Sequence, residues 1–181
     1  MSVEQIMARA DDEFASIFTA VYPNLCRFLE CLLGASGAAQ DVAQETFLRL
    51  YRFGLYRLPP GEARFWVYRV ARNLALNELE KGRTRMKHFG KVVEAFRGTQ
   101  ANPEELFEQV ERRRQVQELM KALPEPQRAA LLLREQEEMS YSEIARVLNV
   151  SESKVKTDIF RARSALRARW NELNDQSAKT S

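Results

Sequence analysis

Six basic side chains recur along the last predicted helix of the chain, and side chains of this type bind phosphates and base edges. They are Lys154, Lys156, Arg161, Arg163, Arg167 and Arg169, set against the acidic Glu152 and Asp158. Because Ser151 can cap the start of this helix, its N-terminal half combines a positive end with hydrogen-bond donors. That combination is typical of a helix that reads the major groove of DNA.

The residues before this helix have the spacing of a helix-turn-helix. Ser140, followed three residues later by Glu143, is the signature of a capping box that starts a short helix through Leu148. Asn149 tolerates the left-handed conformation of a tight turn, and the small Ala145 lets two helices approach closely. The apolar seam consists of Ile144, Leu148, Val150, Val155 and Ile159. A plain helical hairpin with a solvated basic face is the alternative.

A different kind of surface is predicted on the helix over residues 41–53. Ala43, Phe47, Leu50 and Tyr51 are expected to be buried on one face. The opposite face then consists of Asp41, Gln44, Glu45, Leu48, Arg49 and Arg52. An exposed leucine among charged residues indicates either an interaction patch or a single apolar residue at the surface.

The helix predicted over residues 62–80 combines aromatic with polar side chains. Its aromatic residues near the start are Phe65, Trp66 and Tyr68, and its polar residues are Arg69, Arg72, Asn73 and Asn77. Aromatic rings beside arginine and asparagine can stack on unpaired bases. The same rings also suit a helical core, and we expect Trp66 to be a core residue. A basic stretch follows at Lys81–Lys87, which favours a position near phosphates.

Side chains for covalent or metal chemistry are scarce. The 181 residues include two cysteines, Cys26 and Cys31, and one histidine, His88. These numbers exclude a disulfide scaffold and a four-cysteine zinc site, and they leave histidine-based acid–base chemistry without its usual groups. We expect both cysteines to be buried thiols in a reducing compartment, with a redox or metal role as the alternative. The sequence therefore predicts a protein that is not an enzyme and that uses no metal or cofactor.

Helical spacing of apolar residues dominates the chain, so the expected fold class is all-α. With 45% hydrophobic and 29% charged residues, the composition is that of a globular protein. The predicted organisation is two small helical domains at 10–87 and 104–173, a flexible linker at 88–103, and a tail at 174–181. The sequence contains no segment long enough to cross a bilayer and no signal-peptide core, so we expect the chain in the cytoplasm, without membrane insertion.

Taken together, several of these stretches resemble the bacterial sigma-70 family, and most closely its small two-domain extracytoplasmic-function (ECF) branch. They are Asp41–Tyr51 (DVAQETFLRLY), Phe65–Asn73 (FWVYRVARN), Leu123–Arg128 (LPEPQR), Tyr141–Ala145 (YSEIA) and Phe160–Arg163 (FRAR). The resemblance extends over residues 10–170, with the motifs in the family's order. It implies a sigma factor that directs RNA polymerase to promoters.

For the first domain, the resemblance implies docking on the β and β′ subunits of core RNA polymerase and reading of a single-stranded minus-10 element. The implied polymerase contacts are Asp41, Gln44, Glu45, Leu48 and Arg49. The implied minus-10 contacts are Arg69, Arg72, Asn73, Asn77, Lys81, Arg83 and Arg85. Asparagine suits an extruded base because its amide both donates and accepts hydrogen bonds.

For the second domain, the resemblance implies reading of a duplex minus-35 element. The implied contacts are Ser151, Lys154, Lys156, Thr157, Asp158, Arg161 and Arg163. Asp158 stands where many members carry a basic residue, so we expect it to repel phosphate or to accept a hydrogen bond from a cytosine amine. The resemblance also implies an anti-sigma factor as a partner.

Two other interpretations stay open from the sequence. A stand-alone helix-turn-helix regulator explains residues 123–170 but gives the first domain no role. A helical adaptor that sequesters a regulator needs no DNA at all, so charge reversal at Lys156 and Arg161 would leave its function intact.

Overall fold

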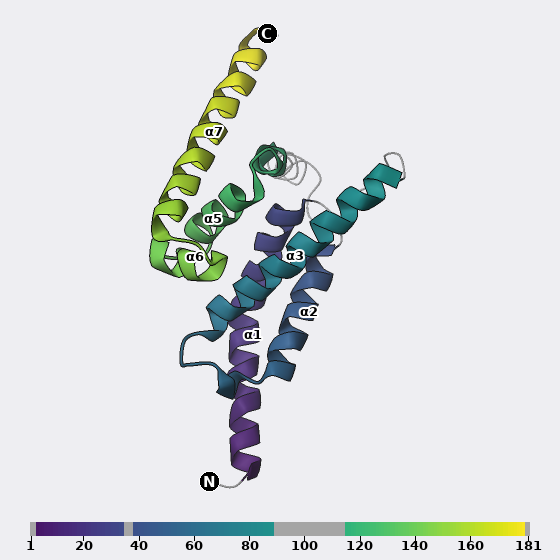
Figure 1. Cartoon of the computed structure of the whole chain (residues 1–181), viewed down its shortest axis with the longest axis vertical. Helices are drawn as coiled ribbons and strands as arrows, with labels where there is room; N and C mark the ends of the chain where they lie inside the picture. The colour runs from purple at the N-terminus through teal and green to yellow at the C-terminus, as the bar shows by residue number, and fades with distance from the viewer. Residues whose placement is uncertain (1–2, 35–37, 89–114, 180–181) are drawn as a thin grey trace, which may run out of the picture. The chain divides into compact units, whose positions relative to one another are not determined.

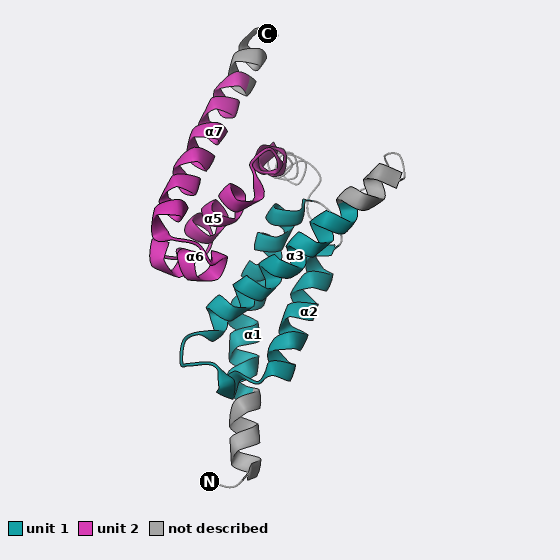
Figure 2. Ribbon diagram, viewed as in Figure 1, with its two compact units in different colours: residues 1–92 teal, residues 93–181 magenta. Residues whose placement is uncertain are grey.

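The chain folds into helices that form two compact units, Met1–Val92 (unit 1) and Val93–Ser181 (unit 2), shown in Figures 1 and 2. The computed structural model describes the backbone of residues 3–34, 38–88 and 115–179, and the side chains of residues 12–34, 38–82 and 115–172. In these ranges there are helices and no strands, which confirms the all-α fold class. Apart from His88, the predicted linker 88–103 lies outside the described residues, as does the predicted start of the second domain at 104.

Unit 1 is a bundle of three long helices with a short 3-10 turn. They are α1 (Val3–Leu33), α2 (Ala38–Phe53), η1 (Leu55–Arg57) and α3 (Ala63–His88). Each long helix packs on the other two. α1 begins before residue 10, and α3 continues past Glu80, where the predicted helix ended. The basic stretch Lys81–Lys87 is therefore helical.

The core of unit 1 follows from apolar residues that recur every three or four positions on each helix. Its fully buried members are Leu25, Phe28, Leu29 and Leu32 of α1, Ala43 and Leu50 of α2, and Val67, Tyr68, Ala71 and Ala75 of α3. The Phe28 and Tyr68 rings meet edge to face, with centroids 5.4 Å apart. Burial of one such large side chain contributes about 1.5–3 kcal/mol to the stability of the folded state. Because all three long helices contribute to this core, it holds them in one arrangement.

Unit 2 contains α5 (Glu125–Glu135), α6 (Tyr141–Leu148) and α7 (Glu152–Lys179), after a helical segment at residues 115–121. These three labelled helices all pack on one another. α5 ends at Glu135, and the chain turns shortly after it, where Glu138 has a φ of 53°. α7 continues to Lys179, so the predicted tail 174–181 is helical up to that residue.

Candidate functional site

The turn between α6 and α7 has the geometry of a helix-turn-helix. The Glu143 amide donates to the Ser140 hydroxyl at 3.3 Å, and the Ser140 amide donates to the Glu143 carboxylate at 2.7 Å, which confirms the predicted capping box. Asn149 follows α6 in the left-handed conformation, with φ 55° and ψ 51°. The Lys154 amide then donates to the Ser151 hydroxyl at 3.2 Å, which caps α7. These caps fix the direction in which α7 leaves the turn.

The predicted apolar seam between α6 and α7 is buried, except for Val150, which is half-buried. Its buried members are Ile144, Leu148, Val155 and Ile159, and the small Ala145 beside them is buried as well. Because Val155 and Ile159 occupy one side of α7, the opposite side of the helix faces solvent.

Most of the residues implied in minus-35 binding lie on that solvent-facing side. The exposed ones are Ser151, Lys154, Lys156, Thr157, Arg161 and Arg163. The Thr157 hydroxyl donates to the Ser153 carbonyl at 3.0 Å, and the Ser151 hydroxyl caps the helix. Lys156 and Arg161 are therefore the side chains best suited to donate to DNA from this face.

Asp158 does not lie on this surface, contrary to the expectation from the sequence. Only 3% of the residue is exposed, and both carboxylate oxygens accept hydrogen bonds from Lys154 Nζ, at 2.9 and 2.7 Å. The carboxylate is thus turned inward and neutralised by the cation one helical turn earlier. It neither repels phosphate nor accepts from a cytosine in this arrangement, and it also engages the ammonium group of Lys154.

Neighbouring helices orient two of the basic side chains of α7. Lys156 Nζ lies 5.8 Å from the ring centroid of Tyr141 on α6, and Arg134 Cζ lies 5.3 Å from the same centroid. At an exposed site a contact of this kind contributes about 0.5–1 kcal/mol, so it biases the lysine toward one orientation. Arg163 pairs with Glu135 of α5, and the hydrogen bond from this ion pair raises the pKa of the guanidinium further above its usual value.

Two exposed aromatic residues of α7 have no role in the prediction from the sequence. Phe160 is 71% exposed and Trp170 is 52% exposed. Phe160 falls outside the spacing of the apolar seam, and this is the signal by which the sequence could have revealed it. Phe160 lies beside Arg161 and four residues after Lys156, where an apolar ring suits contact with a thymine methyl group.

On unit 1, the outer face of α2 presents the residues implied in polymerase binding. Asp41, Gln44, Leu48 and Arg49 are exposed and Glu45 is half-buried, with the Arg49 Nε donating to the Glu45 carboxylate at 2.7 Å. Half of Leu48 is exposed, as the sequence predicted. This face thus combines one apolar residue with charged groups.

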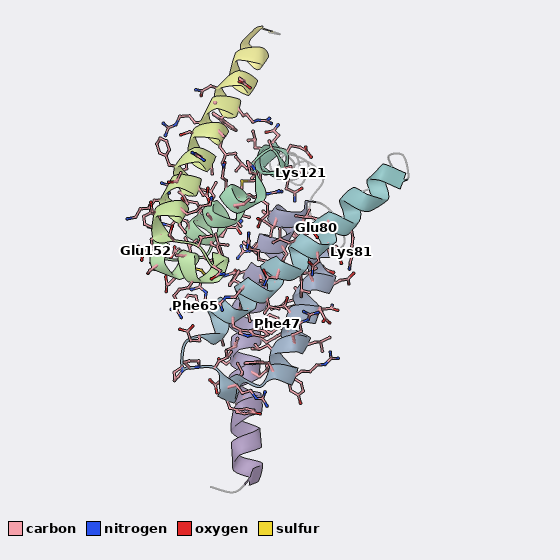
Figure 3. All side chains as sticks on the ribbon, in the orientation of Figure 1. Phe47, Phe65, Glu80, Lys81, Lys121 and Glu152 are labelled. Atoms are coloured by element: carbon pink, nitrogen blue, oxygen red, sulfur yellow. The ribbon has the colours of Figure 1, made fainter. Side chains whose placement is uncertain are left out.

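The prediction that Tyr51 is buried is wrong, because 63% of it is exposed. Its ring nevertheless meets the Phe14 ring edge to face, with centroids 5.5 Å apart. Phe14 also contacts Phe47, the aromatic residue of α2 that is buried and that Figure 3 labels. Tyr51 therefore covers the edge of an aromatic cluster on α1 and α2, and its outer face is left to solvent.

Four residues implied in minus-10 binding form one stripe along α3. Arg69, Asn73, Asn77 and Lys81 follow one another every four residues, and all four are exposed. Arg72 lies beside them and is half-buried. The backbone of Arg83 and Arg85 belongs to α3, but their side chains lie outside the described residues. Tyr68, which the sequence left open as a base-stacking residue, is buried in the core.

A groove of about 650 Å³ between α2 and α3 brings residues from both implied surfaces of unit 1 together. Asp41, Glu45 and Arg49 line it from α2, and Asn77 and Lys81 line it from α3. Val42 and Leu74 add apolar surface, and Glu78 and Glu80 add negative charge. Lys81 Nζ lies 2.7 Å from the Glu78 carboxylate, and Figure 3 labels Lys81 and Glu80 on this helix.

A row of rings and one cation between α2 and α3 was not anticipated from the sequence. The Phe53 and Trp66 rings stack with centroids 5.4 Å apart, so Trp66 is half-buried against α2 rather than fully in the core. Arg57 Cζ lies 5.9 Å from the Phe53 centroid and 5.6 Å from that of Tyr56, which is 79% exposed. The Tyr56 ring packs on Gly54, where a Cβ would lie 2.5 Å from it. The exposed face of the Tyr56 ring forms the end of this row.

Groups for other chemistry are few in the part of the chain that the structure describes. There, His, Cys, Asp and Glu residues do not gather into a group of three or more that could hold a metal ion. Neither Cys26 nor Cys31 is part of a disulfide, and both are half-buried rather than buried. Burial raises the pKa of the Cys26 thiol. Among the described helices, none is both long and apolar enough to cross a membrane.

Comparisons with known proteins identify both units. The model of sigma-70 region 2 matches residues 17–85, and the model of sigma-70 region 4 matches residues 113–166. The ECF RNA polymerase sigma-E factor of Escherichia coli K12 is 33% identical over 175 residues, which cover 91% of this chain and 90% of that protein. The ECF sigma factor SigE of Mycolicibacterium smegmatis is 32% identical over 137 residues, and the chain spans about half of its length (75% of this chain, 53% of that protein).

A solved structure has the same fold. The sigma factor RpoE of Bartonella quintana, solved in complex with the anti-sigma factor NepR, superposes with a TM-score of 0.66 at 22% identity. The superposition covers 86% of this chain and 95% of that one. The motifs, the helix-turn-helix of unit 2 and these matches along both units agree, and the chain belongs to the ECF branch of the sigma-70 family of RNA polymerase sigma factors.

Proposed function

We propose that this sigma factor binds the β and β′ subunits of core RNA polymerase through the outer face of α2, reads a single-stranded minus-10 element with α3, and reads a duplex minus-35 element with α7. The domains that we propose for these tasks are residues 10–87 and 104–173, joined by a linker at 88–103. One observation favours this function over that of a stand-alone regulator. The groove of unit 1 is lined by proposed polymerase contacts from α2 and by proposed minus-10 contacts from α3. A protein that only binds duplex DNA needs neither group of residues.

The α3 stripe suits the capture of melted bases. Asn73 and Asn77 are exposed one helical turn apart, and each amide can donate to and accept from a base edge. Extrusion of a base costs a few kcal/mol, and the exposed aromatic face of Tyr56 offers stacking worth about 1–3 kcal/mol per base. Arg69 and Lys81 supply positive charge for the backbone of the strand.

The exposed face of α7 suits a major groove. Lys156 and Arg161 carry the donors, and each good contact with a guanine contributes about 1–3 kcal/mol of discrimination. Phe160 adds an apolar contact between them, and Arg163 lies further along the helix. The Asp158 carboxylate is buried and paired with Lys154, so it places no negative charge on the face that would contact DNA.

An anti-sigma factor is the regulatory partner that we propose, in the bacterial cytoplasm where polymerase works. The support is the related sigma factor of Bartonella quintana, whose structure contains an anti-sigma factor. In this proposal the chain makes and breaks no bonds, because nucleotide addition belongs to the polymerase.

The proposal is tested by adding the purified chain to sigma-free core polymerase and a pool of host promoter fragments, and then sequencing the transcripts. We expect initiation at a narrow set of sites that share two spaced elements. Stable binding to duplex promoters without polymerase, and no initiation with it, would favour the stand-alone regulator. Initiation that survives Lys156→Glu with Arg161→Glu would contradict the role of α7.

Matched variants separate the two readings of DNA. Asn73→Ala with Asn77→Ala is expected to lower open-complex formation and to leave the affinity for a minus-35 duplex unchanged. Lys156→Ala is expected to lower the affinity for that duplex about tenfold, the effect of losing one good base contact. If both variants impaired the same measurement, either open-complex formation or duplex affinity, the assignment of separate DNA elements to α3 and α7 would be wrong.

A further inference from the structure

Tyr141, the first residue of α6, contacts positive side chains from both of the other labelled helices of unit 2. Lys156 Nζ of α7 lies 5.8 Å from the centroid of its ring, and Arg134 Cζ of α5 lies 5.3 Å from the same centroid. Both distances lie within the roughly 6 Å over which the negative face of an aromatic ring attracts a cation. The ring therefore connects α5 and α7 through its attraction for a cation on each.

The position of the Tyr141 ring is fixed from two sides. Tyr141 directly follows Ser140, and the capping box around Ser140 fixes the backbone there. On the other side, Arg134 Nη1 donates to the Met139 carbonyl at 2.8 Å, and the Met139 amide donates to the Leu133 carbonyl at 3.2 Å. The guanidinium group that contacts the ring is thus tied to the backbone just before α6 begins.

The exposed side chain of Lys156 depends more on the ring for its orientation. A lysine side chain has several rotatable bonds, and it loses their freedom when its ammonium group binds a base or a phosphate. An ammonium group that is already held against a ring has lost part of this freedom before DNA arrives, so binding costs less. The N–H donors that point away from the ring stay available to the DNA.

The ring also lets two positive groups share a small area. Arg134 and Lys156 lie close to the same ring centroid and repel each other, and the negative face of the ring offsets part of this repulsion. If the ring were removed, Arg134 would keep its hydrogen bond to the Met139 carbonyl. Lys156 would keep only the repulsion, so loss of the ring is expected to change the orientation of Lys156 rather than that of Arg134.

We propose that Tyr141 is a positioning residue for minus-35 recognition, whose ring holds the Lys156 ammonium group in the orientation in which it meets the duplex. This inference deepens the proposed function and rests on it in one respect, the assignment of the first turns of α7 to that duplex. Tyr141 itself makes no contact with DNA in this arrangement. It acts through Lys156, so it affects duplex affinity only while Lys156 is present.

The test measures the affinity of the full chain for a labelled duplex that the unaltered chain has selected from a pool of random sequences. Tyr141→Leu removes the ring but keeps an apolar side chain, and is expected to weaken binding about two- to fivefold, the effect of one cation–π contact at an exposed site. Tyr141→Phe keeps the ring without the hydroxyl and is expected to bind as tightly as the unaltered chain. The matched control is Tyr56→Leu, which removes a ring that contacts Arg57 in unit 1 and is expected to leave this affinity unchanged.

Two further measurements separate positioning from simple packing. In a Lys156→Met background, Tyr141→Leu is expected to cause no further loss of affinity, because the group that it positions is absent. In the free chain, nuclear magnetic resonance is expected to show the Lys156 methylene protons next to Nζ at high field, because an aromatic ring shields protons above its face. Tyr141→Leu is expected to return these protons to their ordinary positions.

The proposal is overturned if Tyr141→Leu binds the duplex as tightly as the unaltered chain, or if it weakens binding equally with and without Lys156. It is also overturned if Tyr141→Phe loses as much affinity as Tyr141→Leu, which would indicate a direct contact of the hydroxyl with DNA. Ordinary Lys156 proton positions in the unaltered chain would overturn it even if Tyr141→Leu failed to fold. If the unaltered chain selects no duplex, the proposed role of α7 fails and this inference fails with it. If duplex binding depends on Lys156 but not on Tyr141, the inference alone fails.

Discussion

Lys154 and Asp158 form an ion pair one helical turn apart on α7, with Nζ 2.9 and 2.7 Å from the two carboxylate oxygens. The side chain of Asp158 is 4% exposed and that of Lys154 is 51% exposed, so a surface cation neutralises a buried anion. This pair makes Lys154 a structural residue of the helix-turn-helix as well as a neighbour of DNA.

Replacing Lys154 with alanine is expected to destabilise the fold. The buried carboxylate loses its cation, and hydrogen bonds to charged groups contribute about 1.5–3 kcal/mol each. Urea unfolding followed by circular dichroism measures the change. Lys156→Ala is the control, since Lys156 contacts only a ring face, and equal stability of the two variants would contradict the role of the pair.

The left-handed turn at Asn149 predicts opposite outcomes for two small residues. Asn149→Ala is expected to cost about 1 kcal/mol, because a Cβ without a polar group is strained at φ 55°. Asn149→Gly is expected to keep the stability close to that of the unaltered chain. Thermal unfolding distinguishes them, and a glycine variant less stable than the alanine variant would show that the side chain itself is required.

Leu48 on α2 predicts a loss of polymerase affinity. Leu48→Asp places a charge where half of an apolar side chain is exposed, so folding is expected to be unaffected. Affinity for core polymerase is expected to fall about tenfold or more, as for a central apolar contact. Ala20→Asp, at an exposed position of α1, is the control in the same binding measurement; comparable loss there would indicate a general effect of charge.

Two exposed tyrosines of unit 1 are expected to differ in their contribution to single-strand binding. Tyr56→Ala removes the open ring at the end of the row that includes Arg57 and Phe53, and is expected to weaken binding of a minus-10 oligonucleotide about tenfold. Tyr51→Ala, on the aromatic cluster of α1 and α2, is expected to leave that affinity unchanged. Fluorescence anisotropy with a labelled oligonucleotide compares them.

Cys26 predicts a pH dependence of chemical modification. Burial raises the pKa of its thiol above the usual value, so the folded chain holds less thiolate at a given pH. In a Cys31→Ser background, alkylation near pH 8 is expected to be slower in the folded chain than in urea. The fold is stabilised below the ordinary thiol pKa and loses this contribution as the pH rises through the raised pKa. Equal alkylation rates in both states would contradict the burial of Cys26.

The sequence predicted the helix-turn-helix well because its signals are local. Ser140 with Glu143, Asn149 and Ser151 each act on atoms within a few residues, so spacing along the chain is enough to assign them. Asp158 was misplaced for the opposite reason. Whether a carboxylate of α7 faces DNA or the interior depends on which side of α7 packs against α5 and α6. From the sequence alone, a charged side chain is expected at the surface.

Tertiary packing also explains the other differences. Tyr51 has the spacing of a core residue, but the cluster that it joins lies at the edge of the bundle, so its outer face stays open. The contact of Arg57 with Phe53 and Tyr56 depends on η1, a turn whose shape is fixed by Gly54. The groove between α2 and α3 joins residues far apart in sequence, and no periodicity within one helix reveals it.

That groove has a consequence for how promoter opening is coupled to docking. α2 and α3 pack against each other in unit 1, and the groove between them is lined by Asp41 from α2 and Asn77 from α3. In the proposed function, the packing of α2 on α3 therefore sets the distance and orientation of the melted strand relative to the polymerase surface. Selectivity for the minus-10 element then depends on how the strand is aligned with the polymerase as well as on its contacts with α3. Substitutions of buried residues between α2 and α3 should therefore change which base reaches Asn73 and Asn77, although these residues contact neither DNA nor polymerase.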